Sequence, residues 1–209
     1  MHLKPNELNG NGYQLLDQLD HKELVPFIRT YIKKRNKFSF IYNLSNVLCF
    51  AFAGYCFIRG FNSPEYNLGA NLSHFSYGIA LAFLLLPIHE YIHVLAYKSQ
   101  GALNTSYSAN LRKFYFMALA DQFVANKKEF VIIALAPFVF ISGSLILCMF
   151  FCPSDWIITF AGSLLTHTAM CSGDFGLLSY FDYHKDKEVL TYDNIESKTT
   201  FFMVKTLKV

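Results

Sequence analysis

Four apolar stretches constrain this chain more than any other feature, because each is long enough to cross a bilayer. About 20 apolar residues in a helix span about 30 Å of hydrocarbon, and such stretches occupy residues 38–58, 75–97, 130–152 and 156–181. Hydrophobic residues make up 53% of the 209, and charged residues only 16%, which is unusual for a soluble domain. We therefore predict an all-α membrane protein with about four transmembrane helices.

The positions of the basic residues predict the orientation of these helices. Arg59, in the connection after the first stretch, is the exception among the 18 Lys and Arg; the others lie in the lead, the second connection and the tail. Because Lys and Arg are retained on the cytoplasmic side, both termini should face the cytoplasm. The net charge of +3 lies beside the spans, where it can contact anionic lipid. The lipid bilayer is therefore an expected partner, and nucleic acid is not.

Composition divides the chain into three parts: a basic, amphipathic cytoplasmic lead (1–37), a transmembrane domain (38–181) and a cytoplasmic tail (182–209). In the lead, apolar residues over 13–32 favour a helix on the membrane surface; a simple basic anchor is the alternative. The tail carries two short β-like runs, at 188–192 and 199–204.

The connection between the second and third stretches mixes β-favouring residues with turn formers. This composition predicts a small β-hairpin within residues 103–119. An exposed hairpin edge could pair with an extended peptide; an inert connection is the alternative.

A short motif inside the second stretch carries the clearest chemistry. His89 and His93 enclose Glu90-Tyr91-Ile92, which gives the pattern H-E-x-x-H. Two histidines four residues apart lie about 40° from each other around a helix, so both imidazoles can reach one ion. Catalytic zinc takes such nitrogen ligands and keeps one position for water. Glu90, held beside that water, fits a general base.

Two carboxylates lie at membrane depth, Glu90 in the second stretch and Asp174 in the fourth. Such groups are costly there unless they face a polar interior. His89 lies about 21 Å along its stretch and Asp174 about 27 Å along its own, counted from the same side. Asp174 is therefore the candidate third ligand, and the glycines beside it favour a break in its helix. The alternatives are a His/Glu network that packs helices and an aspartate that hydrogen-bonds another helix.

His167 is a competing ligand, seven residues before Asp174 and on nearly the same helix face. Two helical turns separate them by about 10.5 Å, too far for both to bind one ion in a continuous helix. We assign His167 to the inner cavity and leave ligation open. Small neighbours allow this helix to approach another closely; they are Gly162, Ser163, Thr166 and Ser172.

The cysteines all fall within or at the edges of the apolar stretches, with no loop framework that would predict disulfides. They are expected to act as small packing residues. Cys148 and Cys152 share a helix face, but their expected place at the non-cytoplasmic end does not favour a zinc site.

Several motifs together resemble a family of zincin peptidases of bacterial membranes, itself similar to site-2 intramembrane proteases. They are the run 87–93, Lys98 with Gly101, Ala136-Pro137-Phe138 and Ser172-Gly173-Asp174, and the resemblance covers roughly residues 70–182. It implies a three-helix catalytic core in a bacterial cytoplasmic membrane. It also implies His89, His93 and Asp174 as zinc ligands and Glu90 as the catalytic base.

The sequence thus predicts a membrane-embedded zinc metalloprotease. Zn²⁺ would be its cofactor and a peptide or membrane protein its substrate. One alternative is a non-catalytic membrane scaffold with a structural metal or none. Another is a small transporter in which Glu90, Asp174 and His167 relay protons or bind a cation.

Overall fold

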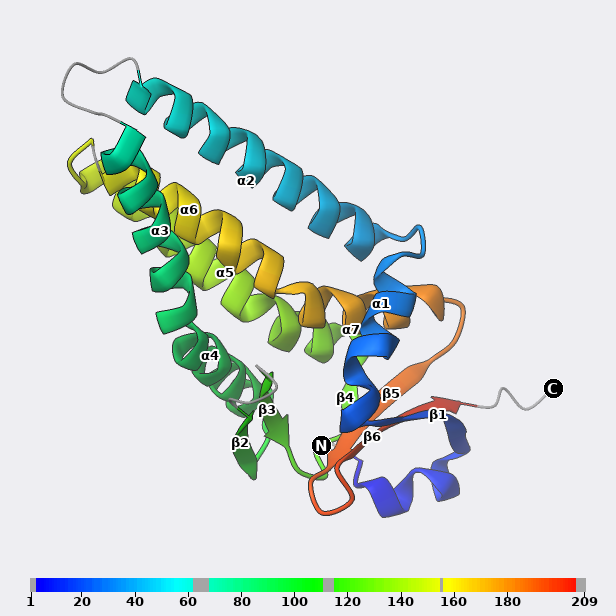
Figure 1. The fold of residues 1–209 in the computed structure, drawn as a ribbon. Helices are drawn as coiled ribbons and strands as arrows, with labels where there is room; N and C mark the ends of the chain where they lie inside the picture. Colours follow the sequence, from blue (N-terminus) through cyan, green and yellow to red (C-terminus); the bar gives the residue numbers. More distant parts are fainter. Residues whose placement is uncertain (1–2, 62–67, 111–114, 155, 206–209) are drawn as a thin grey trace. The chain divides into compact units, whose positions relative to one another are not determined.

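The computed structural model describes residues 3–61, 68–110, 115–154 and 156–205. Arg112, Lys113 and Lys208, which contribute to the predicted orientation, lie outside them. The elements, drawn in Figure 1, are in chain order η1 Pro5–Glu7, η2 Asn9–Asn11, β1 Tyr13–Asp20, η3 His21–Glu23, α1 Leu24–Ile32, α2 Lys37–Phe61, α3 Leu68–Leu84, α4 Leu86–Ser99, β2 Thr105–Asn110, β3 Tyr115–Ala120, β4 Ala125–Asn126, α5 Lys127–Phe151, α6 Trp156–Met170, α7 Ser172–Tyr183, β5 Val189–Asn194 and β6 Thr199–Lys205.

The chain divides into two compact units whose boundaries fall inside helices. The helical unit comprises Phe40–His89 and Pro137–Ser172. The sheet unit comprises Met1–Ser39, Glu90–Ala136 and Gly173–Val209. The predicted three-part division at 37 and 181 stays a prediction.

Three helical segments among the described residues are long and apolar enough to cross a membrane. They are Lys37–Gly60, Leu68–Ser99 and Lys127–Phe151, and they coincide with the first three predicted stretches. Their length and hydropathy agree with a membrane protein.

Two of the predicted spans are interrupted. The second consists of α3 and α4, which meet at Leu85, two residues before Pro87. Proline has no backbone N–H and so removes one hydrogen bond from a continuous helix at this point. The fourth is divided at Cys171 into α6 and α7, of 15 and 12 residues. The expected break near the glycines is therefore present. A fourth membrane crossing remains a prediction, since neither half reaches a full span.

In the helical unit, α3 packs closely against α6. A Cβ atom at Gly78 would collide with the carbonyl oxygen of Thr159, and one at Gly162 would lie 3.1 Å from the carbonyl oxygen of Phe75. The Thr159 hydroxyl also donates to the His74 carbonyl at 3.0 Å. Small residues at such contacts let helix backbones approach, as in other membrane helix pairs.

The sheet unit contains a four-stranded antiparallel sheet in the order β1-β6-β5-β4. Strands β5 and β6 are the two β-like runs of the tail. The predicted helix over residues 13–32 is correct only for α1, because 13–20 form β1 and pair with β6 near the other end of the chain. The expectation of an all-α fold with one hairpin thus misses this sheet.

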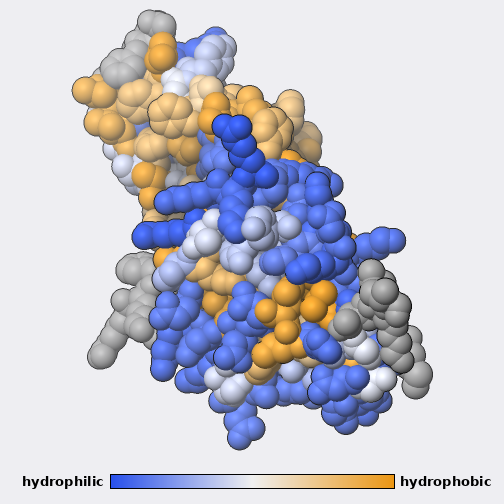
Figure 2. Space-filling view, turned by 90° about the vertical axis from the view of Figure 1, so that its right-hand side faces the viewer, coloured by the Kyte–Doolittle hydropathy of each residue, from blue (hydrophilic) through white to orange (hydrophobic). Residues whose placement is uncertain are grey.

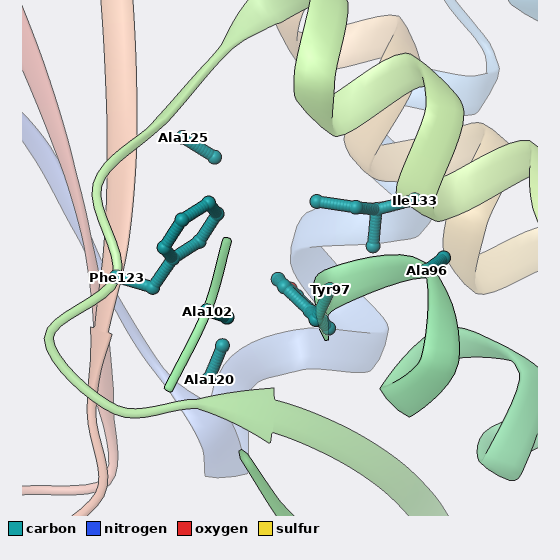
Figure 3. Close-up of a cluster of buried hydrophobic side chains, with 7 residues drawn as sticks. All are labelled: Ala96, Tyr97, Ala102, Ala120, Phe123, Ala125 and Ile133. Atoms are coloured by element: carbon teal, nitrogen blue, oxygen red, sulfur yellow. The ribbon is translucent and has the colours of Figure 1, made fainter. Parts of the chain in front are cut away.

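The predicted hairpin is present, since β2 pairs antiparallel with β3 from Thr105↔Ala120 to Asn110↔Tyr115. Its turn, residues 111–114, lies outside the described residues. Figure 3 shows the buried cluster behind it, in which Tyr97 and Phe123 pack edge to face with ring centroids 6.2 Å apart. Small side chains and Ile133 complete the cluster: Ala96, Ala102, Ala120 and Ala125.

The surfaces of the two units differ in polarity. Figure 2 shows hydrophobic side chains over most of the visible face of the helical unit, and mainly hydrophilic ones over that of the sheet unit. On α2, Phe40 and Phe50 are 65% and 70% exposed. Large apolar side chains exposed in such numbers are expected where a helix faces lipid.

Candidate metal centre

Helix α4 carries the H-E-x-x-H motif and begins just after the break at Leu85. The His89 N–H donates to the Leu85 carbonyl at 2.8 Å, so the helical hydrogen bonding continues across the break. His89, Glu90 and His93 are all buried. Because α4 runs unbroken to Ser99, His89 and His93 lie one turn apart on the same face.

Both nitrogens of His93 have close partners within the sheet unit. Nδ1 lies 2.9 Å from the Ile133 carbonyl oxygen, and because a carbonyl only accepts, Nδ1 must carry the hydrogen. Nε2 lies 3.1 Å from Oδ1 of Asp174. A backbone carbonyl that fixes the histidine tautomer in this way is the usual support of a metal-ligating imidazole.

The separation of these two atoms tests whether a metal fits. Two ligands bound at 2.0–2.1 Å to one tetrahedral zinc ion lie about 3.3 Å apart. The His93–Asp174 distance of 3.1 Å agrees with that value. The donor types also fit, since zinc accepts both imidazole nitrogen and carboxylate oxygen.

Asp174 lies in the first turn of α7, just after the break at Cys171. Gly176, two residues after Asp174, is a glycine for a structural reason, because a Cβ there would lie 2.6 Å from Cγ2 of Ile28. Close packing of α7 against α1 therefore requires a glycine there and fixes the position of the Asp174 backbone.

Glu90 is held by the hairpin. Its Oε2 accepts a hydrogen bond of 2.8 Å from the backbone N–H of Ala118 in β3. Tyr107 pairs with Ala118 across the hairpin, and burial raises the pKa of its phenol, with the Glu90 carboxylate adding to the effect. The Ala118–Glu90 hydrogen bond was not predicted from the sequence, because the register of a hairpin does not indicate which residue of it faces a distant helix.

A second group of ligand-type side chains lies in the helical unit. His167 is fully buried in α6, with Nε2 3.3 Å from Nδ1 of His89 and Nδ1 3.3 Å from the hydroxyl of Ser142. The sulfur of Cys171 lies 3.9 Å from the same Nε2. Cys171 was expected from the sequence to be a packing residue; its i+4 spacing from His167 is the signal that places the two side chains on one helix face.

Fold and site together define a class: a protein with membrane-length helices whose His, Asp and Cys side chains form groups that could hold a metal. The two groups are His89, His93 and Asp174, and His89, His167 and Cys171. The chain belongs to the family described as "Putative zincin peptidase", whose model matches residues 82–187, about half of the chain. This match covers all of the residues just described except Ile28. Neither a curated protein nor a solved structure matches the chain.

Proposed function

We propose that this chain is a zinc-dependent endopeptidase that cleaves peptides within or next to the membrane. The observation that carries the proposal is the contact between His93 and Asp174 at 3.1 Å. His93 lies one helical turn from His89, on the same helix α4 that carries Glu90. His89, His93 and Asp174 would hold the ion, and membership of a zincin family supports zinc as the metal.

A bound zinc ion supplies a Lewis acid that polarises a scissile carbonyl and makes water acidic enough to ionise near neutral pH. Glu90 takes one proton from the attacking water and passes it to the leaving amine as the peptide C–N bond breaks. The hydrogen bond from Ala118 orients the Glu90 carboxylate for this transfer. The Ile133 carbonyl keeps the His93 imidazole in the tautomer whose Nε2 can ligate.

The substrate is a peptide in extended form, because the backbone hydrogen bonds of a helix shield its scissile bonds. The β2–β3 hairpin is the proposed holding edge. Its strand β3 already directs one N–H at the Glu90 carboxylate, and strand addition would align a peptide beside that group.

Substitution of Glu90 by Gln tests the proposal on the full-length chain in detergent micelles. The probes are a randomised quenched-fluorescent peptide library and a set of tagged single-span reporter proteins. We expect the variant to keep stoichiometric zinc and to cleave about 10²–10⁴-fold more slowly. A matched control is Glu129→Gln, at the start of α5. Equal cleavage rates for Glu90→Gln and wild type, or zinc-independent cleavage, would contradict the proposal. No cleavage by the zinc-loaded wild type would favour a scaffold.

A further inference from the structure

The second ligand group, within the helical unit, has no part in the proposed reaction. His89, His167 and Cys171 each offer one ligand atom, and these atoms lie within 4.8 Å of one another. All three residues are buried, to 5%, 1% and 0% exposure. Imidazole nitrogen and thiolate sulfur are both ligands that zinc accepts.

The distances in this cluster suit a metal ion. Two nitrogen ligands of one tetrahedral zinc ion lie about 3.3 Å apart, and a nitrogen and a sulfur ligand about 3.6 Å apart. The corresponding distances from His167 Nε2 are 3.3 Å to His89 Nδ1 and 3.9 Å to Cys171 Sγ. Ser142, at 3.3 Å from Nδ1 of His167, orients the ring as a supporting hydroxyl does at metal sites.

We propose that His89, His167 and Cys171 form a resting position for the metal ion, alternative to the catalytic set; this inference rests on the proposed function. The two sets share His89. A neutral imidazole has one lone pair for a metal ion, so His89 can ligate in one set or in the other, but not in both at once. The ion therefore occupies one position at a time.

The chemistry of the donors sets the two positions apart. Cys171 loses its proton to solvent when it binds the ion. Thiolate is a softer and more electron-donating ligand than carboxylate, so the ion acidifies water less when Cys171 replaces Asp174. The resting set thus keeps the metal bound while the peptidase is inactive.

Cobalt substitution tests this assignment without measuring activity. Full-length protein in detergent is loaded with Co²⁺, and the absorbance is scanned for the thiolate-to-cobalt charge-transfer band in the near ultraviolet. The variants are Cys171→Ser, His93→Ala, which removes a ligand of the catalytic set, and Cys56→Ser, a control at another buried cysteine of the helical unit.

We expect the band in wild type and in Cys56→Ser, at least equal intensity in His93→Ala, and its loss in Cys171→Ser. Should Cys171→Ser fail to fold, X-ray absorption of the zinc-loaded wild type and His93→Ala must show a sulfur ligand at about 2.3 Å. Bound cobalt without a charge-transfer band in either wild type or His93→Ala would overturn the resting position while leaving the peptidase proposal intact. Failure of the Glu90→Gln test would remove the peptidase proposal without removing the band.

Discussion

The two units of this chain differ in which side chains they expose and which they bury. In the helical unit, Phe40 and Phe50 are exposed while Ser163 and His167 are buried. The sheet unit has an aromatic core, in which Tyr180 packs at a tilt against Phe202 with centroids 4.2 Å apart, and both are buried. The exposed apolar side chains of the helical unit agree with its membrane-length helices, because soluble proteins rarely expose so much contiguous apolar area.

The polar groups inside the two units also differ. The helical unit buries the imidazoles of His89 and His167 and the thiol of Cys171. The sheet unit instead holds the carboxylates of Glu90 and Asp174, with the imidazole of His93 beside them. Carboxylates need hydrogen-bond donors and fixed partners when they are buried, and the sheet unit provides these through Ala118 and His93.

The largest expected effect is on cleavage and concerns the carboxylate that faces His93. Asp174→Ala removes the proposed oxygen ligand, and we expect peptide cleavage to fall by at least about 10³-fold, or about 4 kcal/mol. Initial rates with the same peptide library measure this. Asp182→Asn, on the same helix, is the control and should keep its rate. A rate within tenfold of wild type for Asp174→Ala would show that Asp174 is not a ligand of the catalytic ion.

A smaller effect concerns the packing of the helical unit alone. Gly78→Val places a side chain against the Thr159 carbonyl, and overpacking of this kind costs about 3 kcal/mol. We expect a lower unfolding temperature in detergent, together with faster hydrogen exchange in α3 and α6. Gly143→Ala, where an added Cβ meets nothing within 4 Å, should be neutral or slightly stabilising. Equal behaviour of both variants would show that α3 and α6 do not pack closely in the membrane protein.

The smallest expected effect depends on pH and lies in the sheet unit. Burial raises the pKa of Asp193 from 3.8 to about 6, and Asp121 adds to it, although hydrogen bonds from Thr200 and Ala120 oppose the rise. The folded chain therefore holds its proton more tightly than the unfolded chain. The stability from this group is present below about pH 4 and is lost as pH rises through about 6.

Asp193→Asn should remove this pH dependence, because the amide does not titrate. Between pH 4.5 and pH 7 we expect the variant to gain about 2 kcal/mol in free energy of unfolding relative to wild type. This free energy is measured by denaturant unfolding that is monitored through hydrogen exchange of the sheet amides. Asp186→Asn, at an exposed position, should follow wild type at both pH values. If the free energy of unfolding of Asp193→Asn and of wild type changed with pH in parallel, the raised pKa of Asp193 would be contradicted.

Local patterns predicted much of this structure. The lengths and hydropathy of the first three stretches, the H-E-x-x-H spacing and the hairpin all follow from neighbours in sequence. The helix break near Asp174 was expected from the neighbouring glycines. Gly176 itself, however, is required because its backbone packs against Ile28 in α1. Long-range partners were not predictable. Strand β1, near the start of the chain, pairs with β6, near its end, so residues 13–20 form a strand where the surface helix was expected to begin.

Residue types and their spacing were enough to predict which stretches are apolar enough for a membrane and that His89 and His93 lie on one helix face. Both properties depend on residue type and on a fixed rise per residue. The partners of these residues come from the fold instead: Asp174 lies against His93, Ala118 donates to Glu90, and Cys171 lies beside His167. These contacts join segments that are distant in the chain, or lie at a helix break, so they depend on packing within each unit rather than on local periodicity.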